Sequence, residues 1–128
     1  MVDPIPQDVR DFVRECIDSV ARLEVLLLTR SEPQRAWTAD ELGAKLYTSV
    51  DSIAGHIAVL KARGVLVDHE PPNVAYRYQP SSTAIDKTIG DLADLYRERR
   101  VSVVTLIYSE PNANVRTFSD AFRFRKGK

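Results

Sequence analysis

The 128-residue sequence contains one cysteine, one tryptophan and one methionine, and it has no long apolar run. A lone cysteine, Cys16, cannot form a disulfide within the chain, which is typical of proteins in a reducing compartment. The most apolar run, Val101–Ser109, is about half the length of a membrane-spanning helix. The opening residues, MVDPIPQDVRDF, lack the basic and apolar regions of a signal peptide. We therefore expect a cytoplasmic protein without a membrane span.

Patterns of catalytic and metal-binding residues are also missing. The histidines, His56 and His69, have no cysteine or histidine nearby at the spacing of metal ligands. The glycines form no phosphate-binding loop, and no serine has a recognisable base beside it. We expect no enzymatic activity, no metal and no cofactor, and the sequence indicates no ligand pocket.

Basic and acidic residues are equal in number, 18 of each, but they are unevenly distributed. Residues 1–96 carry 10 basic and 15 acidic side chains, whereas residues 97–128 carry 8 basic and 3 acidic ones. Attraction for an anionic partner is therefore expected at the C-terminal end. The final segment, Phe122–Lys128, mixes aromatic and basic residues. It is either a solvated tail or a contact for DNA backbone or an acidic protein surface.

Apolar residues recur at helical spacing in the N-terminal part of the chain. A first helix is predicted from Val9, Phe12, Val13 and Cys16, which fall on one side. A second begins near Asp18 or Ser19 and ends before Pro33, which is incompatible with helix continuation.

Capping signatures mark the next helices. Thr38-x-x-Glu41 follows a short extended segment, and Thr48-x-x-Asp51 precedes a helix of about four turns. The predicted buried stripe of that helix is Val50, Ile53, Ile57 and Leu60. Gly64 stands where a left-handed C-cap is expected.

After Gly64 the apolar pattern alternates. The runs VLVDH and VAYRYQP flank a Pro-Pro-Asn turn and predict a hairpin, with Val74, Tyr76 and Tyr78 on one face. Thr83-x-x-Asp86 then begins a helix of about 26 residues, since nothing breaks the pattern before Ser109 or Pro111. A strand over Val101–Ile107 is the alternative, and a last short helix is predicted near Asn114–Phe124.

The predicted order of elements resembles a winged helix-turn-helix. Residues Trp37–Pro80 carry the resemblance, and ELGAKLYTSVDSIAGHIAVLKARGVL is similar to the helix-turn-helix of MarR-like and ArsR-like bacterial regulators. The tail from Leu92 onward resembles that of small uncharacterised proteobacterial winged-helix proteins. We expect a mostly α fold with a small β-hairpin, an extra N-terminal helix and a long C-terminal helix. Residues 1–80 would hold the first helices and the winged helix-turn-helix, and residues 81–128 the packing or dimerisation helices of the same globular unit.

The resemblance implies a transcriptional regulator that docks Val50–Arg63 in the major groove of duplex DNA. The predicted DNA-binding residues are Thr48, Ser49, Ser52, Gly55, His56, Lys61, Arg63 and Arg77. The first two would bind phosphate at the helix N-terminus, and Ser52 and His56 would face base edges. Gly55 would allow close approach, and the three basic residues would contact flanking phosphates.

The charge pattern favours an alternative function. Basic and acidic residues balance over Thr38–Gly64, and the predicted hairpin tip, DHEPPN, is acidic. Phosphate neutralisation supplies much of the affinity for DNA, so this charge pattern is unfavourable for DNA binding. A winged-helix adaptor that binds another protein without DNA is therefore the second hypothesis.

The helices predicted at both ends of the chain carry more apolar residues than so small a domain is expected to cover. This excess predicts a homodimer. The predicted dimerisation residues are Phe12, Val13, Tyr96, Val103, Val104 and Ile107. A two-fold dimer would space two reading helices over successive faces of the groove.

Overall fold

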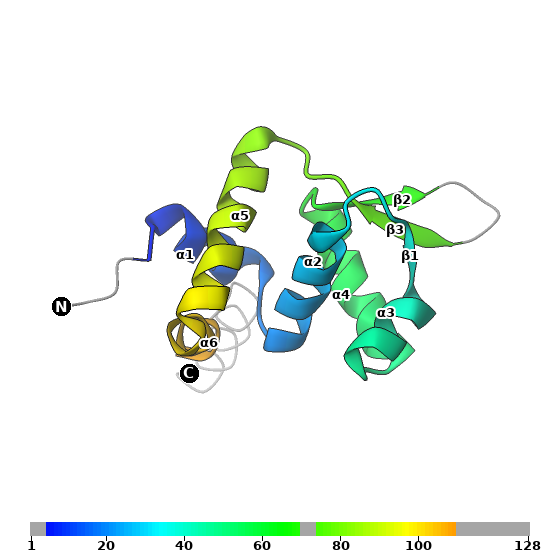
Figure 1. Cartoon of the computed structure of the whole chain (residues 1–128), viewed down its shortest axis with the longest axis horizontal. Coiled ribbons are helices and arrows are strands. Elements are labelled where there is room, and N and C mark those ends of the chain that lie inside the picture. Colours follow the sequence, from blue (N-terminus) through cyan, green and yellow to red (C-terminus); the bar gives the residue numbers. More distant parts are fainter. Residues whose placement is uncertain (1–4, 70–73, 110–128) are drawn as a thin grey trace, which may run out of the picture.

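The computed structural model describes residues 5–69 and 74–109. The described residues form helices and a small antiparallel sheet, which confirms the predicted mostly helical class (Figure 1). In chain order the elements are α1 (Gln7–Cys16), α2 (Val20–Ser31), β1 (Trp37–Thr38), α3 (Ala39–Leu46), α4 (Val50–Ala62), β2 (Leu66–His69), β3 (Ala75–Tyr78), α5 (Thr83–Glu98) and α6 (Arg100–Ser109). The predicted helix near Asn114–Phe124 and the segment Phe122–Lys128 lie outside the described residues.

Helix α2 lies between two groups of elements. Helices α1, α5 and α6 gather on one side of it, and α3, α4 and the sheet lie on the other (Figure 1). A single hydrophobic cluster joins both groups and includes Trp37, Leu60 and Val103. Among the described helices, none is long and apolar enough to cross a membrane.

Cys16 lies in this cluster and is 5% exposed. Burial raises the pKa of its thiol to about 11, so the thiol is protonated at neutral pH. The prediction that Cys16 lies on the apolar side of the first helix is confirmed.

Local hydrogen bonds determine where the helices begin. The capping box of α3 is present, with Glu41 N donating to Thr38 Oγ1 and Thr38 N donating to Glu41 Oε1. The other two predicted boxes are wrong by one residue. Helix α4 is capped by Ser49, and α5 is capped by Ser82. Thr48 is not the cap, and its hydroxyl instead donates to the carbonyl of Leu46 at 3.2 Å.

The sheet has three strands in the order β1-β3-β2, so the short segment Trp37–Thr38 joins the predicted hairpin. Trp37 pairs with Tyr76, and Leu66 pairs with Tyr78. Of the three residues predicted to share a face, Tyr76 and Tyr78 lie in β3, but Val74 does not. Ala75 and Tyr78 are buried, whereas Val74 precedes the paired region and is 74% exposed. Gly64 has a φ of 76°, which confirms the left-handed conformation at the end of α4.

The predicted long C-terminal helix is broken. Helix α5 ends at Glu98, Arg99 leaves the helical region with φ −137° and ψ 59°, and α6 begins at Arg100. The alternative of a strand over Val101–Ile107 is also wrong. An unbroken helix of 26 residues would extend about 39 Å. The break instead lets α6 pack against α1 and α5.

Candidate functional site

Helix α4 is held by one side and exposed on the other. Ile53, Ile57 and Leu60 are at most 3% exposed, and they pack the helix into the core. Val50 was predicted to belong to this buried stripe, and that prediction is wrong, because Val50 is 43% exposed. We define the outward face of α4 by its exposed residues, which are Val50, Asp51, Ser52, Ala54, Gly55, Ala58, Lys61 and Ala62.

Most side chains of the outward face are small. A Cβ atom added at Gly55 would meet no other atom within 4 Å, so this position opens to solvent. Ser52 is also exposed, as predicted. The backbone of α4 can therefore approach a partner closely along this face.

The turn before α4 contains an exposed aromatic residue that the sequence patterns did not single out. Tyr47 is 96% exposed and has left-handed backbone angles, φ 55° and ψ 45°. Glycine or asparagine usually occupies such a helix C-cap, so the sequence carried no local signal for it. Next to it, Thr48 is half-buried, and Ser49 Oγ accepts from Ser52 N at 3.2 Å. The two hydroxyls proposed for phosphate binding thus already make bonds within the turn.

His56 lies at the edge of α4 and contacts α2. Its Nδ1 accepts a hydrogen bond from Arg22 Nε at 3.2 Å, and its side chain is half-buried. Arg22 also pairs with Asp18 at 3.3 Å and donates to the carbonyl of Cys16. Arg22 thus engages one ring nitrogen of His56 from α2, and the role of His56 at base edges stays a prediction.

This contact predicts a pH dependence of stability. Burial and then the charge of Arg22 lower the pKa of His56, against an opposing effect of Asp18. Since this pKa is lower in the folded protein, the unfolded chain binds more protons between the two pKa values. The free energy of unfolding should therefore be fully retained above about pH 6.5 and fall as the pH drops below it. Urea unfolding at pH 7.5 and pH 5.5 measures the difference.

The two histidines provide a matched comparison for this prediction. His56→Gln should reduce the difference in unfolding free energy between the two pH values. His69→Gln should leave it unchanged, because His69 is exposed at the end of β2. Equal effects of both variants would contradict the assignment to the Arg22–His56 contact.

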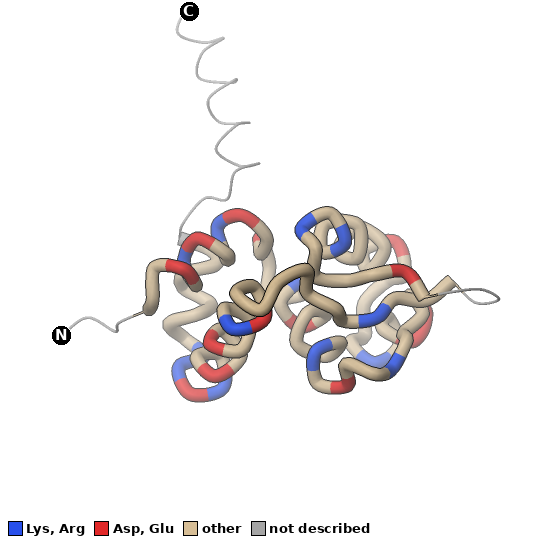
Figure 2. Tube along the Cα trace, turned by 90° about the horizontal axis from the view of Figure 1, so that it is seen from above, with Lys and Arg blue, Asp and Glu red and all other residues tan. Residues whose placement is uncertain are grey.

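The predicted phosphate contacts differ in their availability. Lys61 Nζ forms an ion pair with Asp68 Oδ1 at 2.7 Å. Arg77 is half-buried and donates through Nη2 to Gln79 Oε1 at 2.8 Å. Arg63 is exposed and has no ion-pair partner within the described part of the chain. Figure 2 shows basic and acidic positions interspersed along the described chain, without one extended region of a single sign.

The predicted dimerisation residues are used within the single chain. Val13, Tyr96, Val103 and Ile107 are buried, and Phe12 and Val104 are partly buried against the same core. These apolar residues, which predicted a dimer, are therefore buried or partly buried within the single chain, because α6 turns back after Arg99. The exposed apolar residues of α6 are instead Val101 and Tyr108. The homodimer itself stays a prediction.

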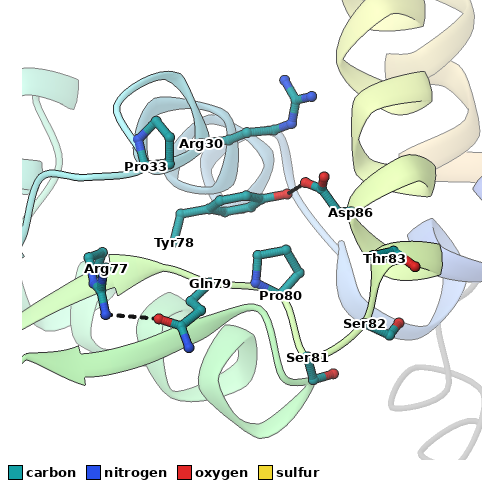
Figure 3. A pocket seen from close by; sticks show the side chains of 10 residues that line it. All are labelled: Arg30, Pro33, Arg77, Tyr78, Gln79, Pro80, Ser81, Ser82, Thr83 and Asp86. Carbon is teal, nitrogen blue, oxygen red and sulfur yellow. Dashed lines mark hydrogen bonds between the residues drawn. The ribbon is translucent and has the colours of Figure 1, made fainter.

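A groove of about 710 Å³ lies where β3 leads into α5 (Figure 3). The Tyr78 hydroxyl points across it and donates to Asp86 Oδ1 at 2.7 Å, which ties β3 to the first turn of α5. Burial and then this bond raise the pKa of Tyr78, so the phenol is protonated at neutral pH. Arg30 and Arg77 also line the groove, and the buried Nε atom of each has no hydrogen-bond partner among the described residues. The sequence indicated no pocket because the lining comes from segments far apart in the chain.

The described residues contain no group of three or more side chains that could hold a metal ion. No protein-family model matches the sequence, and no curated protein matches it.

Proposed function

We propose that this chain is a winged helix-turn-helix protein that binds duplex DNA and regulates transcription, with α4 in the major groove. One observation carries the proposal. Helix α4 is anchored through its buried side, and its outward face is exposed along the helix. The order α3, turn, α4 and β2–β3 hairpin is that of DNA-binding winged helices.

The outward face suits a groove by shape. An α-helix with its side chains is about 10–12 Å in diameter, and the major groove is about 12 Å wide. Ala54, Gly55 and Ala58 keep the helix narrow on this side. Ser52 is the one hydroxyl available for base edges there, so base readout is sparse and DNA shape supplies much of the specificity.

Phosphate contacts would come from cations around α4. Lys45 is exposed in the last turn of α3, and Arg63 is exposed at the end of α4. With Lys61 they give about three phosphate contacts per copy, far fewer than in strongly electrostatic binders. We therefore propose moderate affinity with a shallow dependence on salt.

A titration of a random-sequence duplex and of promoter DNA tests this function. The logarithm of the association constant should fall with the logarithm of salt concentration with a slope of about −2 to −3. Ala58→Glu places a carboxylate on the outward face and should weaken binding about tenfold or more at low salt. Glutamate is a good helix former, so the fold should persist.

Gln34→Glu provides the control for net charge. Gln34 is exposed in the turn between α2 and β1, and this variant should bind DNA like the wild type. Absence of binding by the wild-type protein even at low salt refutes the DNA-binding function.

A second function, docking to another protein, is favoured by a specific observation. Tyr47 and Val50 are 96% and 43% exposed and flank the turn before α4. Exposed aromatic and apolar residues beside a surface of balanced charge are typical of protein contacts. Under this function Tyr47→Ser would remove an anchor for the partner, and DNA would not bind at any salt concentration.

A further inference from the structure

Helix α4 carries a single basic residue, Lys61, in its last turn. A partner molecule that comes close to the outward face meets no lysine or arginine of this helix other than Lys61. The availability of Lys61 therefore has a large influence on how α4 attracts an anion.

Lys61 is already engaged by the hairpin. Its ammonium lies 2.7 Å from Asp68 Oδ1 on β2, and 5.6 Å from the ring centroid of Tyr76 on β3. The two paired side chains are 38% and 66% exposed, so the contact lies at the surface and not in the core. An ion pair in this position adds little to stability, because water screens both charges.

We propose that Asp68 restrains DNA binding by competing with phosphate for Lys61. This inference rests on the proposed DNA-binding function and concerns the regulation of the same site. Asp68 and Lys61 come from adjoining elements, α4 and β2, so the carboxylate is present before any phosphate arrives. DNA must either displace Asp68 or bind without the only cation of α4.

Counterion release gives this competition a measurable signature. A lysine that neutralises one phosphate contributes about 0.9 to the salt slope for duplex DNA. In the wild-type protein this contribution is lost to the extent that Lys61 stays with Asp68 in the complex. A lysine that moves to a phosphate must first give up the ion pair with Asp68. Removing the carboxylate should restore the contribution.

Asp68→Asn is therefore expected to bind a random-sequence duplex about three- to tenfold more tightly at low salt. Its salt slope should be more negative than that of the wild type by up to about 0.9. The effect should be similar for all sequences, because a phosphate contact carries no base information. Fluorescence anisotropy over a series of salt concentrations measures both quantities, and circular dichroism checks the fold.

Asp91→Asn is the matched control. Asp91 pairs with Lys87 at 3.1 Å on α5, so this variant also frees one lysine from one aspartate and changes the net charge equally. Helix α5 lies on the opposite side of α2 from the hairpin (Figure 1). A gain in affinity as large as that of Asp68→Asn would show a general charge effect and overturn the proposal.

Lys61→Gln separates release of the lysine from removal of repulsion. In this background Asp68→Asn still removes a negative charge near the DNA, but it frees no cation. The steeper salt slope should therefore disappear, and its persistence would overturn the proposed competition. If the wild type binds DNA and Asp68→Asn changes nothing, this inference alone fails. If neither protein binds at low salt, the DNA-binding function fails as well.

Discussion

Replacing Ile107 by alanine is expected to lower the free energy of unfolding by about 2–4 kcal/mol. Ile107 is 4% exposed on α6 and belongs to the central hydrophobic cluster. Its loss leaves a cavity on the side of α6 that packs against α1 and α5, and neighbouring side chains can fill such a space only in part. Urea unfolding followed by circular dichroism measures the change.

Val101 provides the control on the same helix, because it is 78% exposed. Val101→Ala should change the free energy of unfolding by no more than about 0.5 kcal/mol. Equal stability of the two variants would contradict the packing of α6 against the domain, and with it the break at Arg99.

Replacing Gly43 by alanine is expected to destabilise the protein by about 1–3 kcal/mol. Gly43 is buried in α3, and a Cβ atom there would lie 2.7 Å from the carbonyl oxygen of Thr48. This oxygen belongs to the backbone of the turn before α4, so it cannot move without shifting the turn. The steric cost outweighs the gain of about 1 kcal/mol that alanine usually brings to a helix. Thermal and urea unfolding test this sign.

Gly55→Ala is the matched helical control, and the opposite sign is expected for it. A Cβ atom at this position meets nothing within 4 Å, so the variant should gain about 0.5–1 kcal/mol of stability. If α4 enters the major groove, the same variant should bind DNA more weakly despite its stability. A gain in stability for both glycine variants would contradict the close contact between α3 and the turn.

Local patterns predicted most of the elements, because helix caps and apolar spacing act over a few residues. The box at Thr38 was correct since a single hydroxyl residue stands at that helix start. The boxes at Thr48 and Thr83 were each displaced by one position. In both cases serine and threonine are adjacent and either can cap a helix, so only the path of the chain into the helix selects one.

The candidate site was predicted in part. Ser52 and Gly55 are exposed on α4, as its apolar spacing indicates. His56 and Lys61 were assigned to an open surface, whereas Arg22 and Asp68 engage them from other elements. A charge or a donor that arrives from a distant segment leaves no trace in the local pattern of the helix.

The sequence by itself determined most of the helical and extended segments, that α4 has one buried side, and that its charges balance. These properties follow from side chains a few residues apart. The tertiary structure decided three further features, namely the break at Arg99, the groove beneath Tyr78 and the engagement of Lys61 by Asp68. In each of them the physical cause is packing or Coulomb attraction between elements, and neither has a periodic signature along the chain.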